Sequence, residues 1–238
     1  MTVAERLHAV HARIAAAAAA AGRAPSSVRL VAVSKTKPAS MIREAYAAGQ
    51  RDFGENYVQE LEAKALDLAD LPDLRFHAIG HLQRNKVKAV IRRAGILHTL
   101  DSLRLIRELA TRAALVPTSQ RPAGVAPDGR YRVLLEVNVG GEAQKSGCTP
   151  DELGALLAEV EQSDALVLSG LMTVPPHTDA PAGARPYFDR LVQLRDRHGG
   201  AARLPELSMG MTQDLEQAVA SGATLVRVGT AIFGERER

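Results

Sequence analysis

The 238-residue sequence contains no tryptophan, a single cysteine and few aromatic residues. Aromatic side chains make up 3% of the chain and hydrophobic ones 46%, so the core must be built from aliphatic side chains. The one cysteine, Cys148, excludes an internal disulfide and is typical of a reducing compartment. These absences exclude a small secreted domain held together by disulfides.

Long hydrophobic runs are also missing. No apolar stretch approaches the ~20 residues of a membrane-spanning helix, and residues 1–7 lack the apolar centre of a secretory signal. A formal charge of +3 does not require a nucleic-acid partner. The seven histidines and the cysteine form no metal-binding pattern. We therefore expect a soluble cytoplasmic protein with no membrane, nucleic-acid or metal partner.

Lysine is scarce as well. Of the thirty basic residues only six are lysines, at positions 35, 37, 64, 86, 88 and 145. One of them, Lys35, lies in "LVAVSKTKPAS", where an apolar run predicts a buried strand that ends at Ser34. A lysine in this place either extends its amine to solvent or uses it as a nucleophile.

Strand-like and helix-like segments alternate after residue 30, which favours a parallel sheet. A helix is predicted over residues 4–21, and the Pro- and Gly-rich segment 117–130 predicts a flexible surface connection within a single domain over residues 1–238. With eight strands the natural solution is a closed (β/α)8 TIM barrel, and an open doubly wound sheet is the alternative. The predicted strands are Leu30–Ser34, Asp52–Glu55, Phe76–Gly80, Ile96–Leu100, Arg132–Val139, Val167–Thr173, Glu206–Met209 and Leu225–Gly229.

Ligands of such barrels bind at the C-terminal ends of the strands. The loops after the seventh and eighth predicted strands carry hydroxyl groups and glycines, the combination that suits a phosphate group. Other polar residues that the strands deliver to this end include Lys35, Glu55, Asn56, Tyr57 and His81. The candidate phosphate residues are Ser208, Gly210, Thr212, Gly229 and Thr230.

A lysine across the barrel mouth from a phosphate site suits Schiff-base chemistry, because partial desolvation favours the neutral, nucleophilic amine. Two ligands fit this arrangement: a phosphorylated sugar or pyridoxal 5′-phosphate (PLP). Arg227 favours PLP, since a guanidinium only donates hydrogen bonds and would keep a pyridine nitrogen unprotonated.

Six segments, in order, resemble the pyridoxal phosphate homeostasis protein family, which is similar to the barrel domain of alanine racemase. They span residues 30–234 and read "VAVSKTKP", "FGENYVQE", "HAIGHLQRNK", "GLMTV", "LSMGMTQD" and "VRVGTAIFG". The resemblance implies a barrel of the PLP fold-type III kind, with an extra N-terminal helix and with Lys35 in Schiff-base linkage to the cofactor. It also implies that Asn56 lies near the ring, that Arg227 faces the pyridine nitrogen, and that the phosphate is held by Ser208, Gly229 and Thr230.

The predicted function is to hold PLP for intracellular vitamin B6 homeostasis, as a monomer that passes the cofactor to PLP-requiring apoenzymes, without turnover. No catalytic residue is therefore assigned. The alternative is a PLP-dependent amino-acid racemase. That reaction needs a second acid/base group, a tyrosine that the racemase takes from an additional β domain, and we expect this chain to end before one. A Schiff-base aldolase acting on a sugar phosphate is a third and weaker hypothesis.

Overall fold

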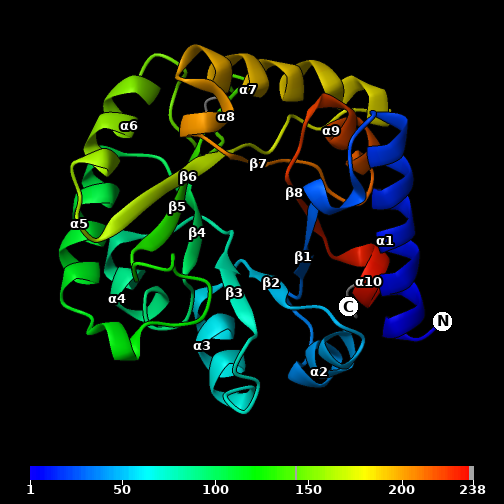
Figure 1. Cartoon of the computed structure of the whole chain (residues 1–238), viewed down its shortest axis with the longest axis horizontal. Coiled ribbons are helices and arrows are strands. Elements are labelled where there is room, and N and C mark those ends of the chain that lie inside the picture. The colour runs from blue at the N-terminus through cyan, green and yellow to red at the C-terminus, as the bar shows by residue number, and fades with distance from the viewer. Residues whose placement is uncertain (143, 236–238) are drawn as a thin grey trace.

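The computed structural model describes residues 1–142 and 144–235 of the chain. Its eight strands are parallel and hydrogen-bonded in chain order, and β8 pairs with β1 to close the barrel (Figure 1). This closure confirms the predicted TIM barrel and excludes the open sheet. The strands are β1 Arg29–Val33, β2 Asp52–Glu55, β3 Arg75–Ala78, β4 Ile96–Leu100, β5 Tyr131–Glu136, β6 Leu166–Met172, β7 Glu206–Ser208 and β8 Leu225–Val228.

Helices surround the barrel (Figure 1), and the longer ones follow the predicted amphipathic patterns. In α5, for example, Ile106, Leu109 and Ala113 are all buried. The last three residues of the predicted domain, 236–238, lie outside the described residues. The α-helices are α1 Val3–Ala20, α2 Ala39–Ala47, α3 Val58–Asp67, α4 Val87–Val90, α5 Leu103–Ala114, α6 Leu153–Glu161, α7 Arg185–Arg197, α8 Gly200–Arg203, α9 Leu215–Ser221 and α10 Thr230–Phe233.

The predicted N-terminal helix is α1, which begins with a capping box between Thr2 and Glu5. Its apolar side chains recur every three or four residues and are buried, as the 3.6-residue period requires. The helix packs beside α9 and α10 (Figure 1), and the 2.9 Å ion pair between Arg13 and Glu216 joins α1 to α9. The N-terminal helix therefore braces the last strand–helix units of the barrel.

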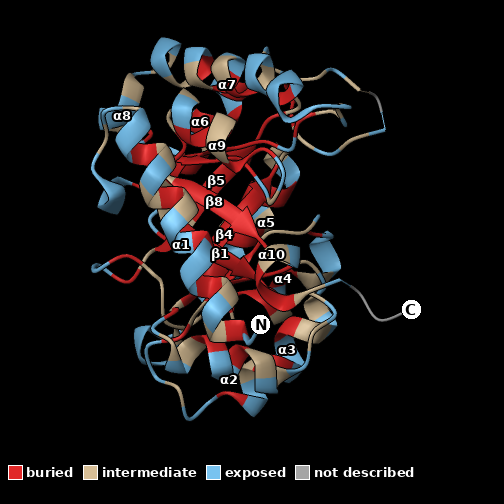
Figure 2. Cartoon of the chain, turned by 90° about the vertical axis from the view of Figure 1, so that its right-hand side faces the viewer, coloured by how far each residue is buried: buried red, intermediate tan, exposed pale blue. Residues whose placement is uncertain are grey.

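Buried residues concentrate in the strands and on the helix faces that cover them, whereas the outer helix faces are exposed (Figure 2). Most of the core lies between the barrel and the helices. A second, small apolar cluster is formed by Val31, Ile96, Leu134, Met172 and Leu225. No helix among the described residues is long and apolar enough to cross a membrane.

The segment 117–130 lies at the N-terminal ends of β4 and β5, and its flexibility stays a prediction. The guanidinium of Arg121 lies 5.5 Å from the ring centre of Tyr131, the first residue of β5. Gly95 approaches the segment so closely that an added β carbon would lie 2.5 Å from the backbone nitrogen of Val125. The segment therefore covers the end of the barrel opposite to the predicted site.

Candidate functional site

Lys35 lies in a tight turn between β1 and α2, and its side chain is half-buried. The next residue, Thr36, has a φ of 62°, which places it in the left-handed region. This conformation is unfavourable for a β-branched residue and persists only where the surroundings impose it. The Thr36 amide donates a 2.7 Å hydrogen bond to Glu60 Oε2, which is one such constraint.

Lys64, on α3, holds the other side of the same turn. Its buried Nζ donates to Ser34 O at 2.7 Å and to carboxylate oxygens of Glu55 and Glu60 at 2.8 Å each. The Ser34 hydroxyl donates to the same Glu55 oxygen at 2.6 Å. Both chain neighbours of Lys35 are therefore fixed by one group of residues, which we call the Lys64 cluster: Ser34, Glu55, Glu60 and Lys64.

The two carboxylates of the Lys64 cluster differ in their electrostatics. Burial raises the pKa of Glu55 above its usual value, and the hydrogen bonds from Lys64 and Ser34 oppose this shift. Burial also acts to raise the pKa of Glu60, but the hydrogen bonds from Lys64 and Thr36 outweigh it, and the positive charge of Lys35 adds to the net lowering. Lys64 is therefore a main opponent of the raised pKa of Glu55 in the folded protein.

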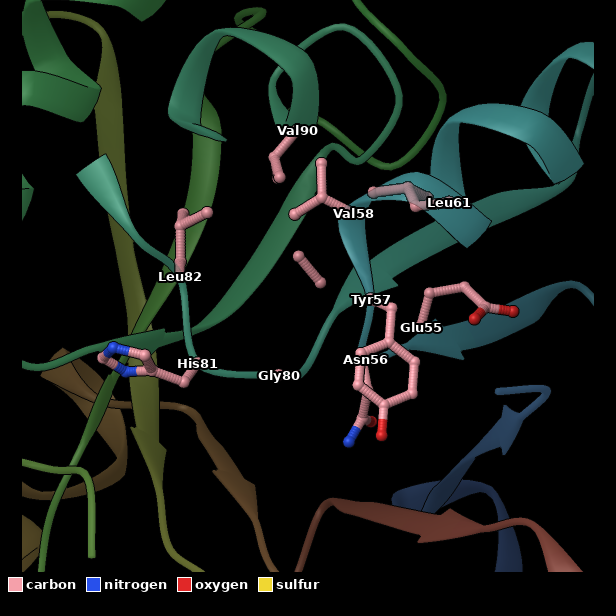
Figure 3. Close-up of a pocket in the computed structure, with 10 residues that line it drawn as sticks. Glu55, Asn56, Tyr57, Val58, Leu61, Gly80, His81, Leu82 and Val90 are labelled. Carbon is pink, nitrogen blue, oxygen red and sulfur yellow. The ribbon is translucent and has the colours of Figure 1, made fainter. Parts of the chain in front are cut away.

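Glu55 was predicted at the barrel mouth together with Asn56 and Tyr57. Figure 3 shows its carboxylate pointing away from the side on which the Asn56 and Tyr57 side chains lie, and this difference corrects the prediction for Glu55. The physical reason is the alternation of side chains along a strand, which sends neighbouring residues to opposite faces.

Gly80 fixes the Asn56 loop, since an added β carbon would lie 2.1 Å from Asn56 O.

Arg227, near the end of β8, is buried with 5% of its surface exposed. Its Nη1 donates to Ser208 Oγ at 2.6 Å and its Nη2 donates to Thr173 O at 2.9 Å. Burial lowers the pKa of Arg227 to about 10, although the charges of Glu136 and Asp214 oppose the shift. The guanidinium is thus oriented by two neutral acceptors, which use two of its five N–H donors.

Glu136, the last residue of β5, is a buried carboxylate that sequence reasoning missed. Its Oε2 atom has no hydrogen-bond partner among the described residues. Burial and the negative charge of Asp101 raise the pKa of Glu136 to about 7, against the opposing charge of Arg227. The site therefore contains one carboxyl group that titrates close to neutral pH.

Gly229 and Thr230, the predicted phosphate residues after β8, lie at the start of α10. Thr230 is exposed, and the Gly229 backbone packs against β1, where an added β carbon would lie 3.0 Å from Val33 O. Because β8 pairs directly with β1, this loop is the neighbour of the Lys35 turn. The predicted arrangement placed the two across the mouth from each other, and the strand order corrects that detail.

Ser208 was predicted to hold the phosphate as well. In the structure its hydroxyl is fully buried and lies 2.9 Å from His98 Nδ1 as well as 2.6 Å from Arg227 Nη1. Through these contacts Ser208 supports Arg227, and its role in holding the phosphate stays a prediction. The ring nitrogens of His77 contact Asp52 and His98, so this histidine belongs to the same buried group as Ser208.

The remaining polar candidates have local partners. His81 is exposed at the mouth, and its Nδ1 lies 3.3 Å from Ser146 Oγ. Lys145 donates to Pro175 O at 2.9 Å. Burial raises the pKa of the Cys148 thiol to about 12, which disfavours the reactive thiolate. Throughout the described ranges there is no grouping of side chains that could hold a metal ion.

The barrel and its site place the chain in a defined class. The family model described as alanine racemase, N-terminal domain, matches residues 6–237. The structure is similar to alanine racemase from Corynebacterium glutamicum, with a TM-score of 0.64 at 16% identity, over 98% of this chain and 62% of that one. At this identity the likeness shows the fold alone.

Relatives with higher sequence identity define the family within this class. The chain is 48% identical to the pyridoxal phosphate homeostasis protein of Pseudomonas aeruginosa, over 99% of this chain and 96% of that protein. It is 42% identical to the one from Aquifex aeolicus over the full length of both. PipY of Synechococcus elongatus, solved with PLP bound, has a TM-score of 0.78 at 37% identity and covers 98% of this chain and 100% of its own. The chain belongs to the pyridoxal phosphate homeostasis protein family.

Proposed function

We propose that this chain binds PLP at the barrel mouth as a Schiff base on Lys35, and that it serves vitamin B6 homeostasis without turning over a substrate. The observation that carries the proposal is the fixed Lys35 turn, clamped on both sides by the Lys64 cluster and adjoining the Gly229–Thr230 loop. The relative solved with PLP bound supports the choice of ligand.

The residues present fit the chemical groups of PLP. Lys35 supplies an amine, and the loop at Gly229 and Thr230 supplies the first backbone N–H groups of α10, which have no acceptor inside the helix. Arg227 supplies donors and no acceptor, as an unprotonated pyridine nitrogen requires. Asn56 lies half-buried at the end of β2, where we propose that it flanks the ring.

When bound, PLP supplies an aldehyde that condenses with a lysine amine with loss of water. The part of this chain is to hold the Lys35 amine in place, which the Lys64 cluster does through Ser34 and Thr36. Arg227 keeps its positive charge despite burial, because its lowered pKa of about 10 remains well above neutral. A cation at that point disfavours protonation of a pyridine nitrogen and so weakens PLP as an electron sink.

A weak electron sink suits a carrier better than a racemase. Racemisation also needs acid/base groups on both faces of the reacting carbon, and the relatives are named as homeostasis proteins. We therefore propose a carrier that delivers PLP to PLP-requiring apoenzymes as a cytoplasmic monomer, with no catalytic residue of its own.

The test is an absorbance titration of the purified protein with PLP, in parallel with Lys35→Ala and the exposed control Lys88→Ala. A visible absorbance band that saturates in the parent and in Lys88→Ala, and is absent in Lys35→Ala, supports the proposal. A parent protein that stays colourless, or a Lys35→Ala variant with the same band, overturns it. Lys35-dependent racemisation of amino acids at enzymatic rates would overturn the carrier function and leave PLP binding intact.

A further inference from the structure

A continuous chain of buried hydrogen bonds runs through the barrel from its N-terminal end to the site. It starts at Arg75, whose Nε and Nη2 donate to the two carboxylate oxygens of Asp52 at 2.7 Å each. Asp52 Oδ1 lies 2.9 Å from His77 Nε2, and His77 Nδ1 lies 2.9 Å from His98 Nε2. The next link is from His98 Nδ1 to Ser208 Oγ, at 2.9 Å.

The burial of this chain excludes water as an alternative partner. His77, His98 and Ser208 have no exposed surface, and Asp52 is 6% exposed. Burial lowers the pKa of both histidines, which are therefore neutral, with one ring nitrogen protonated and the other an acceptor. Burial acts to raise the pKa of Asp52, but hydrogen bonds from Arg75 and His77 outweigh it and lower the pKa overall, so the carboxylate is ionised.

The ionised carboxylate fixes every proton in the chain. Asp52 only accepts, so His77 must carry its proton on Nε2, and its Nδ1 then accepts from His98 Nε2–H. His98 Nδ1 is therefore also an acceptor and takes the hydroxyl proton of Ser208. That leaves the Ser208 oxygen to accept from Arg227 Nη1, at 2.6 Å.

The reverse assignment fails at one point. If His98 donated from Nδ1 to Ser208, His98 Nε2 would accept from His77 Nδ1–H. His77 Nε2 would then face the Asp52 carboxylate as a second bare acceptor at 2.9 Å. Two acceptors without a proton between them in a buried site are strongly unfavourable.

We propose that the Asp52–His77–His98–Ser208 chain is a positioning device that sets the hydrogen-bond direction at Ser208 and thereby holds Arg227 in place from the far end of the barrel. His77, His98 and Asp52 act through Ser208 and Arg227, because both ring nitrogens of each histidine contact other members of the chain. The inference rests on the proposed function in one respect, namely that Arg227 faces the pyridine nitrogen of PLP. It also assigns the Ser208 hydroxyl proton to His98, which makes Ser208 a positioning residue.

The decisive test is the tautomeric state of the two histidines, read from ring ¹⁵N chemical shifts of the ligand-free, ¹⁵N-histidine-labelled protein. Signals are assigned by their loss in His77→Gln and His98→Gln, with the exposed His8→Asn as a control. Both histidines are expected to be neutral Nε2–H tautomers. An Nδ1–H tautomer or an imidazolium at either position overturns the proposal.

Two variants at the far end of the barrel form a matched pair. Asp52→Asn can present an amide N–H to His77 and so reverse both tautomers, whereas Arg75→Gln breaks the same ion pair but keeps the carboxylate. Asp52→Asn is expected to weaken PLP binding about tenfold, the value of one hydrogen bond to a charged group, and Arg75→Gln no more than about threefold. Equal PLP affinities in the two variants, or unchanged tautomers in Asp52→Asn, contradict the proposal.

The tautomers of the parent protein decide the question even if Asp52→Asn does not fold. Ser208→Ala gives a second binding test, because it removes the acceptor of Arg227 Nη1 and is expected to weaken PLP binding about tenfold while His77 keeps its tautomer. Failure of the parent protein to bind PLP would overturn the proposed function without altering the tautomer result, so the two failures are distinguishable.

Discussion

Replacing Lys64 with methionine tests how the Lys35 turn is held. The substitution keeps the length and apolar stem of the side chain but removes a buried ammonium that donates to Ser34, Glu55 and Glu60. Glu55 has no exposed side-chain surface, and its Oε2 already lacks a partner among the described residues. Lys64→Met would therefore leave a buried carboxylate with only the Ser34 hydroxyl as donor.

The expected loss is large. Removing one partner of a buried ion pair costs about 3–5 kcal/mol, and Lys64 is 8% exposed while Glu55 is fully buried. Part of this loss disappears when Glu55 takes up a proton, which its raised pKa makes easier in the folded state than in the unfolded one. The loss of stability is therefore expected to be largest near pH 8 and to shrink as the pH falls toward 5.

The assay is urea unfolding of the ligand-free protein at pH 8 and at pH 5. Lys88→Met is the control, because Lys88 is an exposed lysine. The double variant Lys64→Met/Glu55→Gln is expected to recover part of the loss, because no charge is then left unpaired. PLP affinity should fall in Lys64→Met and stay at the parent value in Lys88→Met. A change in unfolding free energy below about 1 kcal/mol at pH 8, equal to that of the control, would refute this account.

Three further predictions concern other parts of the site. Glu136→Gln should raise the unfolding free energy by about 2 kcal/mol at pH 8 and by little at pH 5. The reason is that the pKa of Glu136 is raised to about 7 in the folded protein, so its ionised form destabilises the fold as the pH rises. Denaturant titrations that show the opposite trend would contradict this. Cys148 should react with a thiol reagent only as fast as the protein opens, and reaction at the rate of a free thiol would contradict its burial. Gly80→Ala should weaken PLP binding by displacing Asn56, whereas Gly154→Ala, inside α6 with its nearest contact at 3.6 Å, should leave binding unchanged; PLP titrations of both variants decide.

The barrel and the residues at its mouth could be predicted from the sequence because they depend on local patterns. Apolar runs, helix periods and strand ends lie along the chain, and parallel topology brings strand ends together. The position of Lys35 at the end of β1 and of Arg227 near the end of β8 follows from these patterns. The packing of the 117–130 segment does not follow from such patterns, since its Pro- and Gly-rich composition is also that of a mobile loop.

The supports behind the site could not be predicted in the same way, because they depend on contacts between distant strands and helices. In the sequence Lys64 is an ordinary helix residue. Only the packing of α3 onto β2 brings it into contact with Glu55. The histidine chain joins residues of four strands, β2, β3, β4 and β7. One signal was available. Asp52, His77 and His98 lie on the inward-facing side of their strands, and the alternation of side chains along a strand could have predicted that the three lie close together inside the barrel.

The central claim is that Lys35 carries the cofactor, and one measurement tests it directly. The protein is mixed with PLP, reduced with borohydride, digested and analysed by mass spectrometry, with fragment spectra that separate Lys35 from Lys37. The account predicts that the reduced pyridoxyl group is found on Lys35 and that little label is found on the other lysines. A label on Lys37, Lys64 or Lys145 with Lys35 unmodified, or no label on any peptide, would contradict it.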